Sequence, residues 1–111
     1  MALNEYIKNE IVRKITEKCN VDNIILFGSY ANGNPNKYSD IDLLIILNQQ
    51  GFLKSFREKI QKKGIISSAL LDLMKKYPID LLVYTKDEWK KLLAINSQFH
   101  KDINNSGIKL I

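Results

Sequence analysis

Five residues suited to phosphate chemistry stand beside three separate apolar runs of the sequence. Gly28 and Ser29 directly follow the first run, Asp40 and Asp42 open the second, and Asp80 lies near the start of the third. Glycine lets a phosphate approach the backbone closely, and backbone N–H groups together with a hydroxyl bind anions. Carboxylate oxygens are the ligands that Mg²⁺ prefers in proteins. The combination predicts a site where a triphosphate rests while the aspartates hold its metal ions.

The aspartates repel one another, so a cation is needed to compensate them. Side chains alternate along a strand, so Asp40 and Asp42 should point to one face and share an ion. Residues 40–47 contain no lysine or arginine that could neutralise them. With Asp80 completing a second site, two divalent ions roughly 3.5–4 Å apart would clamp the attacking and leaving oxygens of a phosphoryl displacement. A phosphatase of the haloacid dehalogenase type places such aspartates at the end of a strand, whereas here the apolar run follows them.

Apolar periodicity predicts the elements that position these residues. Spacings of three and four indicate helices, and short continuous or alternating apolar runs indicate strands. We expect a helix over 3–19, strands over 24–27, 40–47 and 79–84, helices over 52–64 and 66–77, a helix after the capping-box sequence 85–88, and an edge strand over 108–111. Trp89, Leu92, Leu93 and Phe99 should form the buried side of the helix that follows residue 85. The run after Asp42 is apolar on both faces, so that strand should be central.

The resulting order predicts one domain over residues 1–111 of the α/β (α+β) class, a small mixed β-sheet with helices packed against it. The 111 residues are 45% hydrophobic and contain one cysteine and one histidine. These numbers exclude an intrachain disulfide and a histidine-pair metal site. No apolar stretch of about 18 residues exists, which argues against a membrane span. We therefore expect a soluble cytoplasmic protein with no membrane partner.

The net charge of +5 favours anionic partners such as nucleotides, RNA or acidic protein surfaces. Basic residues gather on one expected helical segment, at Lys54, Arg57, Lys59, Lys62 and Lys63. Because charge runs usually serve solubility, we favour a solvated helix face over contact with RNA or an acidic partner. A plain RNA-binding domain would also need exposed aromatic residues on the sheet, and that pattern is missing.

The motif residues resemble the nucleotidyltransferase superfamily related to DNA polymerase beta. Leu26-Phe27-Gly28-Ser29-Tyr30-Ala31-Asn32-Gly33 followed by Ser39-Asp40-Ile41-Asp42-Leu43 is similar to the signature of that superfamily, and Asp80 in Pro78-Ile79-Asp80-Leu81-Leu82-Val83 matches its later strand aspartate. The resemblance is closest to the minimal nucleotidyltransferases (MNT), which are small and stand alone. It covers nearly the whole chain.

The resemblance implies a nucleotidyltransferase fold and transfer of a nucleoside monophosphate, AMP from ATP or its equivalent from another NTP, to a hydroxyl. It implies that Asp40 and Asp42 ligate two Mg²⁺ ions. Asp80 would ligate the ion at the nucleophile and help to remove its proton. Gly28 and Ser29 would contact the outgoing phosphates, which leave as pyrophosphate.

One position departs from this pattern. Many relatives carry a basic residue where this chain has Asn32. Another basic residue must then balance the negative charge of the triphosphate, and Lys37 is the candidate. Tyr30 and Tyr38 flank the expected site, and we favour packing or surface exposure for them over stacking on a base.

The resemblance also implies a partner. Larger transferases carry a helical domain that holds the acceptor, and the chain leaves no room for one, so the acceptor site should come from another polypeptide or a second copy. MNT proteins are often paired with a helical HEPN toxin, and some act as antitoxins by adenylylating it on a tyrosine. The alternative is a non-catalytic antitoxin that neutralises its partner by occlusion. The presence of all three aspartates favours the enzyme.

Overall fold

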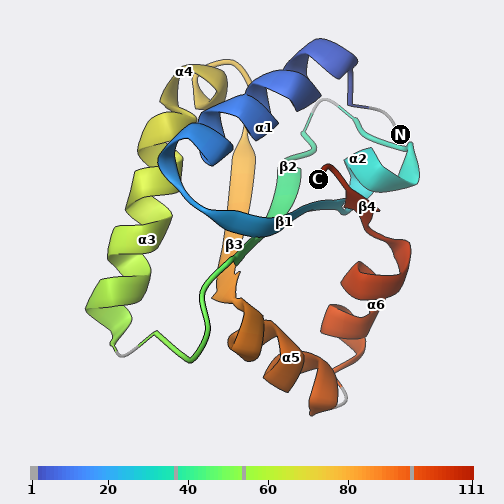
Figure 1. Cartoon of the computed structure of the whole chain (residues 1–111). Coiled ribbons are helices and arrows are strands. Elements are labelled where there is room, and N and C mark those ends of the chain that lie inside the picture. The colour runs from blue at the N-terminus through green and yellow to red at the C-terminus, as the bar shows by residue number, and fades with distance from the viewer. Residues whose placement is uncertain (1–2, 37, 54, 96) are drawn as a thin grey trace.

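A four-stranded mixed sheet forms the middle layer of the computed structural model, which describes residues 3–36, 38–53, 55–95 and 97–111. Its strands lie in the order β3-β2-β1-β4 (Figure 1). Strand β2 pairs parallel with β3 and antiparallel with β1, while β4 pairs antiparallel with β1 at one edge. The strands are β1 (Val21–Phe27), β2 (Ile41–Leu47), β3 (Ile79–Thr85) and β4 (Ile108–Lys109). The mixed sheet, the central position of β2 and the edge strand near the C-terminus are confirmed.

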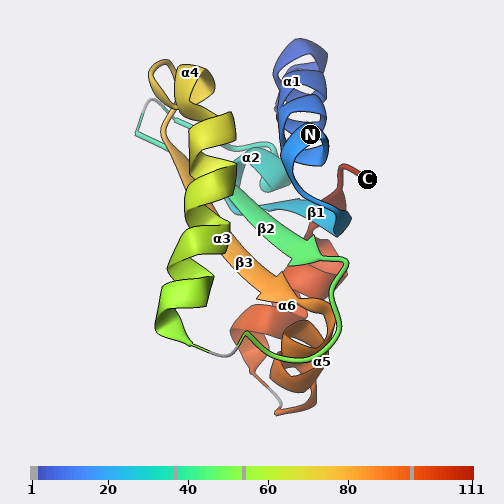
Figure 2. The ribbon, with the colours of Figure 1, turned by 60° about the vertical axis from the view of Figure 1, so that its left-hand side comes forward.

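Helices cover both faces of this sheet. Helices α1, α3 and α4 lie on one side, and α5 and α6 lie on the other (Figures 1 and 2). The helices are α1 (Glu5–Lys18), α2 (Ser29–Asn32), α3 (Phe56–Ala69), α4 (Leu71–Met74), α5 (Lys86–Ala94) and α6 (Gln98–Ser106). None of the described helices is long and apolar enough to cross a membrane.

The alternation of β2 divides the core into two apolar layers. Leu43 and Ile45 pack in the layer beneath α1 and α3, whereas Leu44 and Ile46 pack with Trp89 of α5 on the opposite face. All five residues from Leu43 to Leu47 are buried. Burial on both faces fixes the register, because a slip of one residue would exchange the two layers.

Two expected helices have different limits. Phe52 lies in the loop before α3, and α3 continues through Gly64 to Ala69. Residues 66–69 of the helix expected over 66–77 therefore belong to α3, and α4 covers only Leu71–Met74. Helix α3 begins where the Ser55 side chain accepts a hydrogen bond from the Glu58 N–H, so its start follows a cap and not the apolar spacing. Gly64 has open space around it and is accommodated inside the helix, where glycine costs only about 1 kcal/mol.

The segment after residue 85 forms two helices, α5 and α6, in place of one. Phe99 was expected on a buried helical face, but its side chain is 54% exposed. The turn between the helices changes the direction of the chain, so the apolar spacing does not continue across it. Helix α6 also extends to Ser106, and β1 begins at Val21, three residues before the expected strand.

The beginning of α5 holds the loop that leaves β2. Thr85 is fully buried and forms the expected capping box with Glu88. The Thr85 hydroxyl also donates to the carbonyl of Gly51, while the Gly51 N–H donates to the Asp87 carboxylate at 2.6 Å. Gly51 has a φ of 76°, a left-handed conformation that favours glycine.

We expect Thr85→Ala to lower the free energy of unfolding by roughly 1–2 kcal/mol, because it removes a helix cap and leaves a buried carbonyl without its donor. Urea unfolding followed by circular dichroism measures the change. Thr85→Ser is the control, since it keeps the hydroxyl and should recover most of the loss. Equal unfolding midpoints for Thr85→Ala and the unmodified chain would show that this cap contributes nothing.

Candidate active site

Parallel pairing places Asp42 and Asp80 side by side. The two residues are direct partners in the register of β2 and β3, and neighbouring strands lie about 4.8 Å apart. The Ile41 N–H donates to the Pro78 carbonyl at 2.8 Å, which fixes the strands one residue before the pair. Because Leu44 and Ile46 alternate with Ile45, Asp42 shares the sheet face covered by α5 and α6.

Gly28 brings the backbone against this pair. Its neighbour Phe27 is the register partner of Asp42 on β1. Gly28 has a φ of 75°, and a Cβ added to it would overlap the Asp42 Oδ2 atom. Glycine is therefore required here both for its conformation and for the close approach of the carboxylate.

Among the described residues, no cation pairs with the charge on Asp42. Desolvation by burial raises the pKa of Asp42 above its ordinary value of 3.8, and the charges of Asp80 and Asp40 raise it further. In the described part of the chain, none of the ion pairs includes these three aspartates. The electrostatic arrangement favours a bound cation or a shared proton.

Asp40 stands apart from the other two aspartates. It precedes β2 and is exposed, and its effect on the Asp42 pKa is smaller than that of Asp80. Across residues 3–36, 38–53, 55–95 and 97–111, no three acidic, histidine or cysteine side chains gather closely enough to hold a metal ion. The structure therefore brings together the Asp42–Asp80 pair but not all three carboxylates.

The donor chemistry of the pair fits Mg²⁺. This ion takes oxygen ligands and is typically held by one or two carboxylates together with substrate phosphates and water. Asp42 and Asp80 supply two carboxylates that form no ion pair within the part of the chain that the structure describes. Asp40 is close enough to affect the pKa of Asp42, and its exposure leaves it free to contribute a third ligand.

A hollow opens beside Gly28 on the far side from β3. Ser29 begins the short helix α2, and the Asn32 N–H donates to the Gly28 carbonyl at 3.1 Å. The hollow has a volume of about 340 Å³ and is lined by Phe27, Gly28, Ala31, Asn32, Phe99, Asp102, Ile103, Ser106 and Gly107. Phe27 and Phe99 meet edge to face, with their ring centroids 6.2 Å apart.

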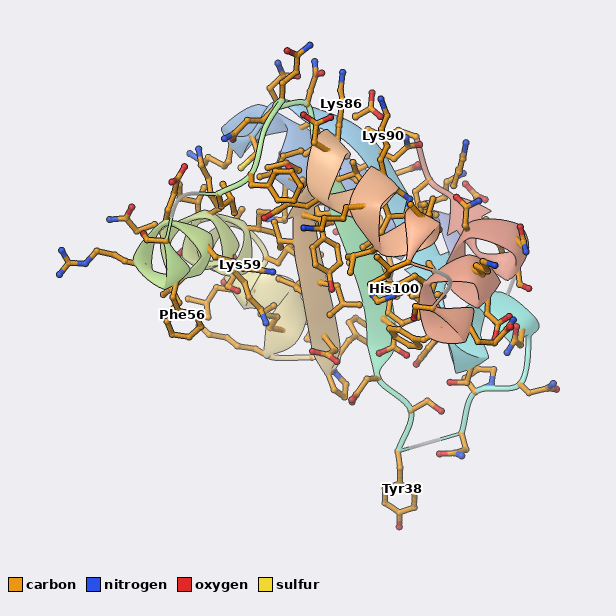
Figure 3. All side chains as sticks on the ribbon, turned by 90° about the horizontal axis from the view of Figure 1, so that it is seen from below. Tyr38, Phe56, Lys59, Lys86, Lys90 and His100 are labelled. Atoms are coloured by element: carbon orange, nitrogen blue, oxygen red, sulfur yellow. The ribbon has the colours of Figure 1, made fainter. Side chains whose placement is uncertain are left out.

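The lining from α6 is the part of the site that sequence reasoning missed. Phe99, Asp102 and Ser106 are spaced by three and four and share one helical face. That spacing indicated that the three residues share a helical face, but it did not show which strand the helix would cover. Tyr30 packs partly buried against the core, and Tyr38 is 80% exposed in the loop before β2 (Figure 3). Lys37 and Lys54 lie outside the described residues.

His100 packs among aromatic rings. Its ring lies 5.3 Å from that of Phe99, 5.7 Å from that of Trp89 and 6.2 Å from that of Tyr84, measured between centroids. Its Nδ1 atom is buried and has no hydrogen-bond partner among the described residues. These contacts indicate a packing role for His100.

Comparison with known proteins agrees with the fold. Residues 7–104 match the model of the nucleotidyltransferase domain family. “Putative protein adenylyltransferase MJ0141” of Methanocaldococcus jannaschii is 31% identical over 93 residues, which cover 84% of this chain and 82% of that protein. “Putative protein adenylyltransferase MJ1305” of the same organism is 29% identical over 85 residues, covering 71% of this chain and 54% of that protein.

A solved structure described as “Crystal structure of the toxin-antitoxin with AMP-PNP” has the same fold. Its TM-score is 0.58 at 22% identity, and the match covers 94% of this chain and 72% of the other. The chain belongs to the nucleotidyltransferase domain family. Its enzyme class is that of the nucleotidyltransferases.

Without metal, we expect Asp42→Asn to be neutral or to stabilise the fold by no more than about 1 kcal/mol at pH 7, since solvent screens this half-buried group. The folded-state pKa of Asp42 is raised, so its ionisation destabilises the fold as pH rises above 3.8. The gain in free energy of unfolding from Asp42→Asn should therefore vanish below about pH 3, where the Asp42 carboxyl is protonated in both the folded and the unfolded state. Urea unfolding at several pH values in a chelator measures this. A large loss of stability in Asp42→Asn would instead make Asp42 a structural hydrogen-bond acceptor.

Gly28→Ala should destabilise the chain by about 2 kcal/mol or more, because it combines backbone strain with overlap at Asp42. Gly33→Ala is the matched control. Gly33 has a φ of 82°, but a Cβ added there would meet no other group within 4 Å, so it should lose only about 1 kcal/mol. Thermal or urea unfolding compares them, and equal losses would mean that Asp42 does not press against Gly28.

Proposed function

We propose that this chain transfers AMP from ATP to a hydroxyl of a partner protein, as the antitoxin of a pair whose toxin is a helical HEPN-type protein. The observation that carries the proposal is the registered pair of Asp42 and Asp80, set against Gly28 at the edge of a hollow. The names of the two Methanocaldococcus jannaschii relatives support protein adenylylation, and the fold of the toxin-antitoxin structure supports the biological setting.

Each part of the site has a role in this proposal. Asp40, Asp42 and Asp80 hold two Mg²⁺ ions, with Asp42 and Asp80 as the fixed ligands. When bound, Mg²⁺ neutralises the triphosphate and stabilises the charge that develops during displacement. Gly28 and Ser29 hold the outgoing phosphates.

The hollow beside α2 is the proposed nucleoside site. Its volume of about 340 Å³ lies within the usual range for small-molecule pockets. The rings of Phe27 and Phe99 offer apolar surfaces for a base, and Asp102 and Ser106 offer hydrogen-bonding groups for a base or ribose. Asn32 also lines the hollow, so its uncharged amide is placed to contact the nucleotide.

The proposed transfer is an in-line displacement. The acceptor hydroxyl oxygen forms a bond to the α-phosphorus of ATP while the bond from that phosphorus to the bridging oxygen breaks. Pyrophosphate leaves with the electron pair. The hydroxyl proton passes to the carboxylate of Asp80, which is exposed and can release the proton to solvent.

The acceptor comes from a partner because the described elements are all used by the transferase fold. We propose that residues 1–111 form one nucleotidyltransferase domain in which β3, carrying Asp80, lies at the open edge of the sheet. The single cysteine and the need for ATP favour the cytoplasm as its location.

Occlusion without catalysis is the second candidate. Two observations favour it: Asn32 supplies no charge for a triphosphate, and the three aspartates are not gathered into one cluster within the described residues. In that case the chain neutralises its partner by covering it, and loss of the aspartates leaves neutralisation intact.

With Mg²⁺, ATP labelled at the α-phosphate and the protein encoded by the adjacent reading frame, we expect label on that protein and release of pyrophosphate. Asp42→Asn and Asp80→Asn should each lower the transfer rate by about a hundredfold or more. Asp72→Asn is the control, because Asp72 is an exposed residue of α4. Neutralisation of the partner without any transfer of label would establish occlusion, and unchanged transfer by both site variants would overturn the catalytic proposal.

A further inference from the structure

A second hollow lies at the β3 edge of the sheet, away from the proposed nucleoside site. It has a volume of about 230 Å³, and its walls include Phe52, Lys59, Tyr84, Lys91, Leu92 and Ile95. These residues come from the loop after β2, from α3, from β3 and from α5. Lys59 extends from α3 toward β3, across the sheet face from His100 of α6 (Figure 3).

Two large apolar side chains that line this hollow, Phe52 and Ile95, are open to solvent, and so are Phe56 and Ile60 on the helix that carries Lys59. Phe56 is 80% exposed, Ile95 61%, Ile60 54% and Phe52 53%. Phe56 and Ile60 are four residues apart and share the face of α3 that also presents Lys59 (Figure 3). Exposed apolar groups that gather around a concavity mark interaction sites more often than isolated ones do.

Hydrogen bonds on both sides hold Phe52 in place. The N–H of Gly51 donates to the Asp87 carboxylate at 2.6 Å, and the N–H of Leu53 donates to the Glu88 carboxylate at 3.4 Å. The aromatic ring of Phe52 is thus presented by a segment fixed to the first turn of α5. A group already held in position loses little conformational entropy when a partner binds.

Lys59, Lys91 and Glu88 all line the hollow, so two positive charges and one negative charge give it a formal charge of +1. The Nζ atom of Lys59 lies 4.6 Å from the centroid of the Tyr84 ring, and that of Lys91 lies 5.3 Å from the centroid of the Phe52 ring. Neither lysine takes part in an ion pair in the described ranges of the chain. The carboxylate of Glu88 accepts bonds from the backbone N–H groups of Thr85 and Leu53. Two cations thus remain to attract an acidic group.

We propose that this hollow docks a segment of the acceptor protein in which an apolar side chain is flanked by carboxylates. The apolar side chain fills the space over Tyr84 and Leu92, and the carboxylates pair with Lys59 and Lys91. A second copy of this chain is a poor occupant, because a net charge of +5 on each copy repels. A flat membrane surface would not fill a concave space of side-chain size.

The position of the hollow relates it to the proposed transfer, on which this inference rests. Tyr84 follows Asp80 by four residues on the same face of β3, so about 13 Å separate the hollow from the reacting carboxylates. The proposed nucleoside site lies at the other side, beside β1 and α6. A partner held at the β3 edge would bring its hydroxyl to Asp80 without covering the nucleotide.

The probe is a blocked hexapeptide with a central phenylalanine–leucine pair and two glutamates on each side. We expect ¹⁵N-resolved NMR titration to shift signals of Lys59, Tyr84 and Leu92, and a Kd that Lys59→Glu weakens by roughly tenfold or more. Lys90→Glu is the matched control, since Lys90 projects from the far side of α5 (Figure 3) and should change the Kd by less than about threefold. Phe56→Ser and Ile95→Ser alter exposed side chains and should weaken binding without lowering the unfolding midpoint.

Two control peptides separate the apolar from the charged contribution. Replacing the phenylalanine–leucine pair by glycine–serine, or the four glutamates by lysines, should abolish binding. Equal binding of the lysine-flanked peptide, or equal Kd values for Lys59→Glu and Lys90→Glu, would overturn the proposal. So would Lys59-dependent binding to phosphatidylserine vesicles in the absence of peptide binding, or self-association that Phe56→Ser abolishes.

The docking and transfer proposals fail separately. Asp42→Asn should bind the acidic peptide with an unchanged Kd although its transfer of AMP is lowered. Peptide binding by the unmodified chain without any transfer of AMP to the partner would refute only the proposed function. Full transfer to the partner by a Lys59→Glu, Phe56→Ser double variant that no longer binds the peptide refutes the docking site alone.

Discussion

The parallel pairing of β2 with β3 is the constraint on which the site depends, because it sets Asp42 beside Asp80. Partial burial raises the pKa of Asp42, and the like charge of Asp80 beside it raises that pKa further. The apolar layers behind the aspartates hold the strands in register, since a slip of one residue would expose the core side chains of β2. The buried core of the sheet thus holds the two carboxylates side by side, and a bound cation would reduce the repulsion between them.

The order of the strands divides the surface around this pair into two sides. Gly28 and the hollow beneath α6 lie on the β1 side, whereas Lys59 and the exposed aromatic residues lie at the β3 edge. A nucleotide on one side and a protein acceptor on the other could then meet at the aspartates. This arrangement is the basis of the proposed transfer, in which the described elements supply the nucleotide site and a partner supplies the hydroxyl.

The sequence predicted the elements whose signals are local. β2 was recognisable because it is apolar on both faces, and the start of α5 because Thr85 and Glu88 have capping-box spacing. Alternation predicted a shared face for Asp40 and Asp42, whereas the pairing of Asp42 with Asp80 depends on the non-local register of β2 and β3. The spacing of Phe52, Phe56 and Ile60 did not distinguish a core stripe from an exposed one. The hollow beside Gly28 depends on α6 packing back onto β1, which is a non-local contact. Asp40 lies one residue before the β2 ladder, so alternation alone did not predict its exposure.

The central claim is that Asp42 and Asp80 bind a divalent cation together with a nucleotide. Electron paramagnetic resonance titration of Mn²⁺, which can replace Mg²⁺, in the presence of a non-hydrolysable ATP analogue tests it most directly. The account predicts that Asp42→Asn and Asp80→Asn each weaken Mn²⁺ binding by about tenfold or more, while Asp72→Asn binds as the unmodified chain does. Equal Mn²⁺ affinity in all four proteins would contradict it.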